Sequence, residues 1–196
     1  MSSQFLPLTL PDRTRKQVPA GCTVREALTP EGGRLDAKVL AAKINGEPMD
    51  LSRPLEQDAT IEPLTFESAE GREVYRHSST HIMAQAVKEV FPTVQLTIGP
   101  ALDDGFYYDF AFDRPFTPED LEKIEARAIE IMKRGLTVTR SELSKQDAIK
   151  FFQERGEGYK VELINSFDDA SPISLYRQGE FVDLCRGPHL PTTGYV

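Results

Sequence analysis

The change of sequence pattern near residues 64–72 limits most strongly what this chain can fold into. Before it, short apolar runs of strand length alternate with turn signals, whereas after it a helical pattern extends over residues 72–91. Short strands have to pair with one another, and a long helix has to bury its apolar stripe against other elements. The pattern therefore predicts two domains, at residues 1–65 and 66–196.

The first domain is expected to be a small unit of strands with one short helix. Thr23 is a typical N-cap for a helix over residues 24–28, and Asn45-Gly46 is a typical hairpin turn. A hairpin, a helix and then further strands follow in the order of a ubiquitin-like β-grasp. The expected strands cover residues 5–10, 15–19, 39–44, 49–51 and 59–64.

The second domain is expected to be a larger unit of the α+β class. Pro92 ends a first helix, Thr117-Pro118 begins a second, and Ser144 caps a third. A hairpin is expected about Gln178-Gly179, and the apolar piece after Tyr159 is left unassigned. The expected helices cover residues 72–91, 118–134 and 145–155, and the expected strands cover residues 94–98, 106–112 and 136–143.

Composition and charge are those of a soluble globular protein. Hydrophobic residues make up 39% and charged residues 28% of the chain, and no run approaches the ~20 apolar residues of a membrane span. The N-terminus lacks the pattern of a secretory signal, so we expect a cytoplasmic protein with two reduced cysteines. The net charge of −8 argues against non-specific nucleic-acid binding. Any contact with RNA is therefore expected at a local site.

The placement of the three histidines is the most informative feature for function. His77 and His81 are four residues apart on the first long helix, so their side chains share one face. His189 follows Cys185 by four residues, and the intervening Gly187-Pro188 makes this second pair a loop. Every histidine thus belongs to an HxxxH or CxxxH element.

Several readings of these four residues remain open on spacing alone. They can be ordinary helix and core residues, or they can form a closed zinc site with three nitrogen ligands and one sulfur ligand. Cys185 can also serve as a thiol nucleophile beside a basic partner. A metal-free hydrolytic pocket would use the imidazoles around a bound water.

Four segments in this order resemble the editing domain of bacterial threonyl-tRNA synthetases. The resemblance extends over residues 72–191, and residues 3–65 resemble the TGS domain, a β-grasp module that precedes the editing domain in that family. The fold class it implies is α+β, with a small β-grasp domain followed by a larger editing domain. The segments that carry it are HSSTHIMAQAVKEVFP, IGPALDDGFYYDF, GYKVEL and FVDLCRGPHLP.

The resemblance implies hydrolysis of mischarged seryl-tRNA(Thr) after its synthesis, with threonyl-tRNA spared. Its expected partners are the acceptor end of tRNA(Thr) and the catalytic and anticodon-binding domains of a synthetase, with no membrane partner. None of the adenylation motifs of a class II synthetase is found, so no ATP site is expected. No cofactor is expected to be required, although bound zinc would not be surprising.

The family's pocket also carries over to residues of this chain. The catalytic residues it implies are His77 and Lys160, which would position and polarise the attacking water, together with His81, which would also shape the small side-chain pocket beside Cys185.

The remaining matches imply substrate-binding roles. Asp183 would pair with the α-ammonium of the substrate, and Tyr108 and His189 would border the terminal adenosine. One departure is visible, because Thr80 stands where the family usually has an alanine before its second histidine.

Two rival functions remain. A zinc-dependent hydrolase of the alanyl-tRNA editing type would use the same HxxxH and CxxxH elements around a metal. A non-catalytic tRNA-binding or regulatory module would fit the occurrence of TGS domains in regulatory proteins.

Overall fold

The computed structural model describes residues 5–102, 104–168 and 172–196. The chain forms two compact units, the first made of Met1–Tyr75 and Gly187–Pro191 and the second of Arg76–Arg186 and Thr192–Val196. Residues 1–4 of the predicted first domain, and Asp103 of the IGPALDDGFYYDF segment, lie outside the described residues.

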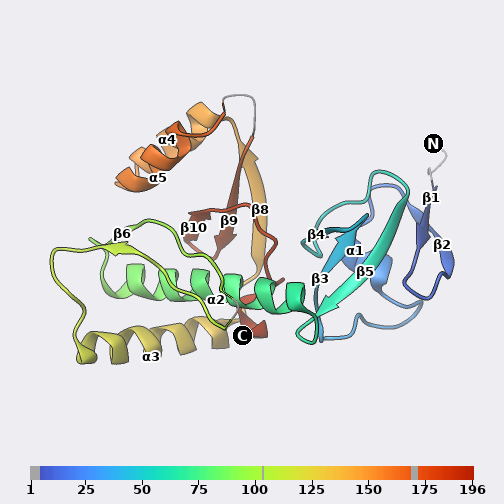
Figure 1. The fold of residues 1–196 in the computed structure, drawn as a ribbon, viewed down its shortest axis with the longest axis horizontal. Coiled ribbons are helices and arrows are strands. Elements are labelled where there is room, and N and C mark those ends of the chain that lie inside the picture. The colour runs from blue at the N-terminus through green and yellow to red at the C-terminus, as the bar shows by residue number, and fades with distance from the viewer. Residues whose placement is uncertain (1–4, 103, 169–171) are drawn as a thin grey trace. The chain divides into compact units, whose positions relative to one another are not determined.

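The first unit contains a five-stranded mixed sheet with one short helix (Figure 1). The strand order is β2-β1-β5-β3-β4, and the central pair β1 and β5 is parallel whereas the other pairs are antiparallel. This is the arrangement of a β-grasp, as the order of elements in the sequence predicts. The elements are β1 (Phe5–Thr9), β2 (Arg15–Pro19), α1 (Val24–Leu28), β3 (Val39–Ile44), β4 (Glu47–Met49) and β5 (Ala59–Thr65).

Local signals explain why these elements form where they do. Thr23 and Glu26 make a reciprocal capping box at the start of α1. Asn45 and Gly46 have positive φ angles of 53° and 91°, so β4 begins at once and is shifted from the predicted 49–51. The alternating side chains of the strands bury one apolar face on α1, with a core that includes Leu6, Leu8, Val24, Ala27, Leu51 and Ile61.

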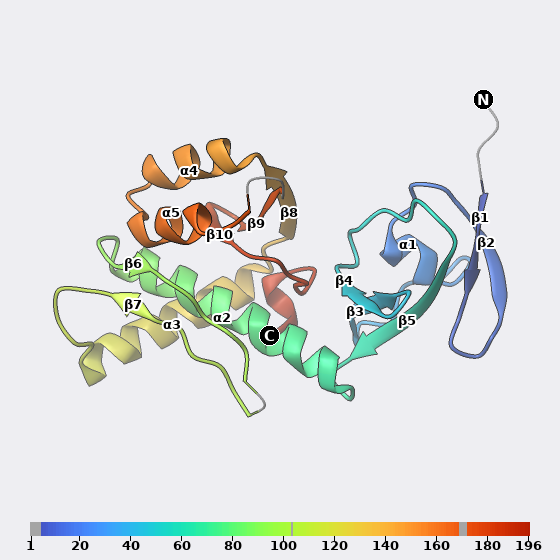
Figure 2. The ribbon, with the colours of Figure 1, turned by 45° about the horizontal axis from the view of Figure 1, so that its top comes forward.

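The second unit combines a helix pair, a short hairpin and a three-stranded antiparallel sheet of order β10-β9-β8 (Figures 1 and 2). Its helices are α2 (Ala69–Val90, which begins in the first unit), α3 (Pro118–Arg134), α4 (Lys145–Gln153) and α5 (Gly158–Asn165), with a terminal 3₁₀ turn at Thr193–Tyr195. Its strands are β6 (Gln95–Leu96), β7 (Phe110–Ala111), β8 (Val138–Leu143), β9 (Ile173–Gln178) and β10 (Phe181–Leu184).

Two apolar clusters hold this unit together. Helices α2 and α3 lie side by side in Figures 1 and 2, and they share a core that includes Ile82, Val87, Ile124 and Ile131. Helices α4 and α5 pack on the β8–β10 sheet through Phe152, Ile164, Ile173 and Leu175. Helices α2 and α3 therefore bury apolar side chains at helical spacing, as the sequence predicts, whereas α5 buries Lys160 together with Ile164.

The bounds of several elements shift by a few residues, as α2 begins at Ala69 instead of residue 72, and two regions of the second unit need further comment. The predicted strands at 94–98 and 106–112 shorten to β6 and β7, because only Gln95↔Ala111 and Leu96↔Phe110 pair as a ladder. The unassigned apolar piece after Tyr159 is helix α5.

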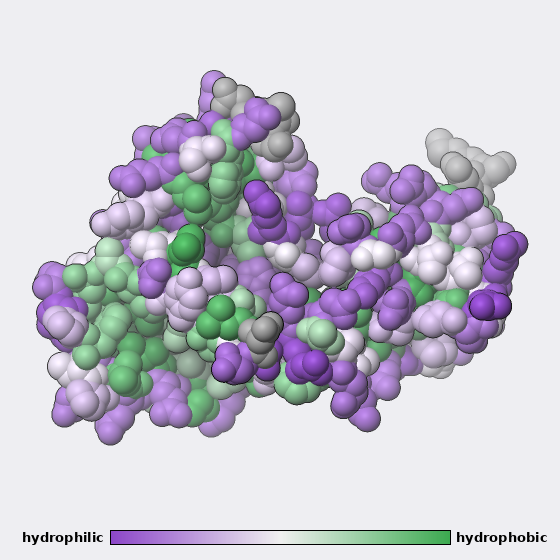
Figure 3. All heavy atoms as spheres, in the orientation of Figure 1, coloured by the Kyte–Doolittle hydropathy of each residue, from purple (hydrophilic) through white to green (hydrophobic). Residues whose placement is uncertain are grey.

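Apolar surface gathers over the β6–β7 hairpin and the adjoining helix of the second unit (Figure 3). Phe91, Phe112 and Phe116 contact one another there and are each only partly buried. Within the described residues, no helix combines the length and apolar character required to cross a membrane.

Truncation of Phe152 tests the importance of the α4–α5 cluster. Phe152 is 1% exposed, and we expect Phe152→Ala to lower the free energy of unfolding of the second unit by about 3–5 kcal/mol. Leu121→Ala on the exposed face of α3, where the side chain is 57% exposed, serves as the control and should change it by less than about 0.5 kcal/mol. Chemical denaturation followed by circular dichroism measures both values, and equal effects would contradict the assignment of this core.

Candidate functional site

Helix α2 brings His77 and His81 to one face, as their spacing predicts. Their rings meet edge to face, with centroids 5.5 Å apart and planes at 90°. Thr80 is fully buried, and its hydroxyl donates a hydrogen bond of 2.6 Å to the carbonyl oxygen of His77. The Thr80 hydroxyl, which the expected alanine would lack, therefore has its hydrogen-bond partner within the same helix.

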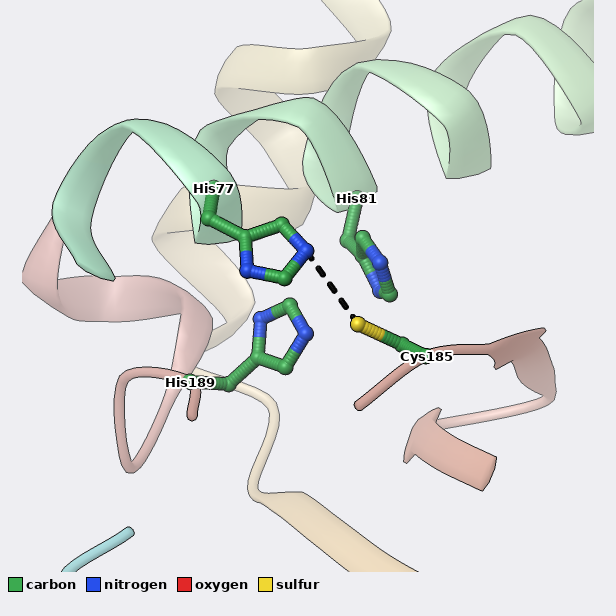
Figure 4. Close-up of side chains that lie close together, drawn as sticks. All are labelled: His77, His81, Cys185 and His189. Carbon is green, nitrogen blue, oxygen red and sulfur yellow. Dashed lines mark hydrogen bonds between the residues drawn. The ribbon is translucent and has the colours of Figure 1, made fainter. Parts of the chain in front are cut away.

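Cys185, which directly follows strand β10, contributes a thiol to the site. The Sγ of Cys185 lies 3.1 Å from Nε2 of His77 (Figure 4). The ligand atoms of His77, His81, Cys185 and His189 all lie within 4.8 Å of one another. The two pairs singled out in the sequence therefore meet.

A second cluster is a buried polar network of Lys160, Tyr108 and Asp183. Lys160 is the third residue of α5, and its Nζ lies 2.7 Å from Oδ1 of Asp183 and donates to the hydroxyl of Tyr108 at 3.1 Å. The Tyr108 hydroxyl donates to Oδ2 of Asp183 at 2.8 Å, and the backbone N–H of Leu184 donates to Oδ1 at 2.8 Å. All three side chains are at least nine-tenths buried, so the two charges compensate each other away from water.

This network determines the protonation states of its members. Burial acts to raise the pKa of Asp183, but the ammonium of Lys160, the neighbouring His81 and the hydrogen bonds outweigh it, so the pKa is lowered. Burial, followed by the negative charge of Asp183, raises the pKa of Tyr108 far above its usual range. Asp183 is therefore a carboxylate, and Tyr108 a neutral phenol, at neutral pH.

Both helix histidines are neutral at neutral pH. Burial lowers the pKa of His81 to about 3, although the charge of Asp183 opposes this effect. Burial also lowers the pKa of His77, again against Asp183. The Nε2 of His81 is 3.9 Å from Oδ2 of Asp183, which is a contact of a neutral ring and not an ion pair. Neutral imidazoles can accept protons or bind a metal.

The two clusters meet around one cavity of about 220 Å³. Six of the seven candidate residues line it: His77, His81, Tyr108, Lys160, Asp183 and Cys185. A larger cavity of about 620 Å³ shares Leu163, Leu184 and Cys185 with it. The arrangement offers basic, acidic and thiol groups beside a space large enough for a small ligand.

The apolar wall of this cavity includes Ile98, Gly99 and Pro100, for which the residue patterns predicted no role. A Cβ at Gly99 would lie 2.2 Å from Cδ2 of Tyr108, so only glycine allows the tyrosine ring to pack there. The Gly99-Pro100 pair within IGPALDDGFYYDF is the sequence feature that could have indicated this wall.

The donor set of His77, His81, Cys185 and His189 suits a metal ion. Imidazole nitrogen and thiolate sulfur are both ligand types of zinc, structural zinc sites have four ligands, and the four ligand atoms here are already grouped. The group could therefore hold zinc, and the expectation that no metal is required remains a prediction.

Two segments of the chain match the models of known protein families. Residues 8–65 match the TGS domain, and residues 173–196 match the threonyl and alanyl tRNA synthetase second additional domain. The second match contains Asp183, Cys185 and His189. The chain therefore carries domains found in aminoacyl-tRNA synthetases.

Similar proteins over nearly the whole chain are threonine–tRNA ligases of bacteria. The ligase of Symbiobacterium thermophilum is 52% identical over 194 residues, which are 99% of this chain. Those of Carboxydothermus hydrogenoformans and a Geobacter species are 49% and 50% identical over 98% and 96% of the chain. The chain spans about 30% of the length of each of these curated relatives.

The pKa of His81 leads to a prediction about acid stability. Because its pKa is lower in the folded protein than the ordinary 6.5, the unfolded chain binds the proton more tightly, and stability is lost as the pH falls from 6.5 towards 3. His81→Gln should reduce this loss by about 1.4 kcal/mol per pH unit between about pH 6 and pH 4. Denaturant unfolding in the presence of a chelator measures the slope. Parallel profiles of the two proteins below pH 6 would show that His81 is not buried in its neutral form, and the difference between them should be constant above about pH 7.5.

Proposed function

We propose that this chain is the editing region of a threonyl-tRNA synthetase and that it hydrolyses the ester bond of seryl-tRNA(Thr). The observation that carries the proposal is the single cavity lined by two neutral histidines and by the buried Lys160–Tyr108–Asp183 network. The substrate is inferred from the similarity of nearly the whole chain to threonine–tRNA ligases.

The histidine and lysine at the cavity provide what ester hydrolysis requires. A neutral His77 can accept a proton from an attacking water, and such general-base assistance is worth on the order of 10²–10⁴-fold in rate. Lys160 has three N–H donors, of which two serve Asp183 and Tyr108, and the third can polarise the ester carbonyl or orient the water. His81 lines the same cavity and completes the proposed catalytic group.

Recognition of the substrate amine is assigned to Asp183. Its carboxylate accepts hydrogen bonds from Lys160, Tyr108 and the backbone of Leu184, and a carboxylate has about four acceptor positions. One position therefore remains for the α-ammonium of a seryl ester. Since the amine is a positive charge placed beside that of Lys160, binding depends on Asp183 remaining ionised.

A small cavity is also what discrimination against threonine demands. Serine and threonine differ by one methyl group, which is worth only ~1–3 kcal/mol in a binding pocket. A synthetic site that accepts threonine therefore cannot strongly exclude serine, and a second, tighter site is the solution that synthetases use. The proposed tight wall is Cys185 with His81, and the larger neighbouring cavity has room for the terminal nucleoside, beside which we assign Tyr108 and His189.

One second candidate is favoured by the grouping of His77, His81, Cys185 and His189. If these residues hold zinc, the metal would act as a Lewis acid on the ester or its water, as in zinc-dependent aminoacyl-tRNA hydrolases. In that case the same chain would lose activity on chelation and regain it with added zinc.

Deacylation in a chelator tests the proposed function. We expect the chain to release serine from seryl-tRNA(Thr) while threonyl-tRNA(Thr) persists as long as in buffer alone. His77→Ala should slow serine release on the order of 10²–10⁴-fold because the proton acceptor is lost. Lys123→Ala, on the exposed face of α3 and outside the cavity, is the matched control and should retain the wild-type rate.

The alternatives give different outcomes in the same assay. Hydrolysis only after zinc is restored, with alanyl-tRNA preferred, would favour the zinc-dependent hydrolase. Binding of tRNA with no hydrolysis of any ester, in chelator or in zinc, would favour a non-catalytic module.

A further inference from the structure

We propose that Glu157 is a positioning residue for this site, acting through helix α5 and the β6–β7 hairpin on Lys160 and Tyr108. The inference rests on the proposed function for its catalytic consequence, but its structural part stands apart from it. Glu157 lines neither of the two cavities described above, and no pattern in the sequence pointed to it.

The carboxylate of Glu157 does not serve its own helix. Glu157 is the N-cap residue of α5, yet its side chain makes no capping hydrogen bond there. It is 6% exposed, and its Oε2 accepts a hydrogen bond of 3.1 Å from the backbone N–H of Leu96 in β6. Its Oε1 pairs with Nζ of Lys88 at 2.7 Å. An acid buried in this manner connects α5 to the end of α2 and to β6, with 61 positions between Glu157 and Leu96.

A second hydrogen bond joins α5 and β6, this time from the backbone of α5 to a side chain of β6. Gln95, the neighbour of Leu96, accepts a hydrogen bond of 3.2 Å through Oε1 from the backbone N–H of Gly158. Lys88 in turn donates to the carbonyl oxygen of Val94 at 2.8 Å, which fixes the turn between α2 and β6. We call Glu157, Lys88 and Gln95 with these partners the α5 clamp.

The α5 clamp lies next to the two segments that carry Lys160 and Tyr108, whose side chains both contact Asp183. Lys160 lies two residues after Gly158 in an eight-residue helix, too short to hold its position by helix propensity alone. On the other side, β6 pairs with β7, and the hairpin is extended by a hydrogen bond of 2.9 Å from Asp109 N–H to the carbonyl oxygen of Ile98. Tyr108 precedes Asp109 in this hairpin. Glu157 therefore ties the segment that carries Lys160 to the segment that carries Tyr108.

Loss of the clamp should displace Lys160 from Asp183 and Tyr108. A misplacement of about 1 Å caused away from the chemistry can cost on the order of 10²-fold in rate. Because Glu157 itself does not line the cavity, the maximal single-turnover rate should fall while the protein concentration for half-maximal rate changes little.

A chemically matched control exists in the same unit. Asp120 is also a buried carboxylate near a helix start, where it accepts the backbone N–H of Thr117 and pairs with Arg114. It lines neither cavity. Asp120→Ala therefore reproduces the loss of a buried acid, its ion pair and its backbone hydrogen bond, but away from the site.

The first readout does not depend on activity. The wild-type chain, Glu157→Ala and Asp120→Ala are treated with an amine-acetylating reagent, and modification of each lysine is followed by peptide mass spectrometry. Lys160 is 2% exposed, so it should react slowly in the wild type and at least about tenfold faster in Glu157→Ala, with no change in Asp120→Ala. Exposed Lys123 is the internal reference and should react equally in all three proteins.

The second readout is deacylation of seryl-tRNA(Thr), at a temperature where all variants are folded. Glu157→Ala should lose at least about tenfold in maximal rate, and Glu157→Gln, which keeps an acceptor for Leu96 N–H, should recover part of it. Asp120→Ala should retain the wild-type rate.

The outcomes separate this inference from the proposed function. Equal protection of Lys160 in Glu157→Ala and the wild type would overturn the positioning role, whatever the activity. Faster Lys160 labelling in a chain whose wild type hydrolyses no ester would support the clamp and count against the proposed function.

Discussion

The buried ion pair between Lys160 and Asp183 is the interaction on which the rest of the site depends. Both side chains are almost completely removed from water, where removal of one partner of such a pair costs about 3–5 kcal/mol. The pair is tolerated because Tyr108 and the backbone of Leu184 satisfy two further acceptor positions of the carboxylate. Its charge balance also keeps Asp183 ionised, whereas burial lowers the pKa of His77 and His81 and leaves both rings neutral.

The fold makes this pair feasible by bringing three separate segments together. Helix α5 supplies Lys160, strand β10 supplies Asp183, and the β6–β7 hairpin supplies Tyr108 against Gly99. Helix α2 covers the same cavity with His77 and His81. Each of these segments is held by apolar packing elsewhere, so the polar groups are positioned by the cores and do not have to find one another unaided.

Much of this could be anticipated from residue patterns. Caps and turns such as Thr23, Asn45-Gly46 and Thr117-Pro118 are local devices, and the two helices begin where the patterns predicted, whereas β4 begins at Glu47 instead of residue 49. The strands about β6 and β7 were overestimated, because alternation of apolar residues cannot reveal that Tyr108 turns into a polar network. Helix α5 was left unassigned, because its eight residues bury Lys160 together with Ile164 and so show no clean amphipathic stripe.

Residue patterns alone are enough to specify the β-grasp order of the first unit, the helical spacing that brings His77 and His81 to one face, and the grouping of chemistry-bearing residues into a few motifs. These follow from local backbone preferences and periodicity, which act over a few residues. The compensation of Asp183 by Lys160, the neutral histidines and the contact of Glu157 with β6 arise only in the folded chain. Those properties depend on desolvation and on contacts such as that between Glu157 and Leu96, which are 61 positions apart and which no local pattern encodes.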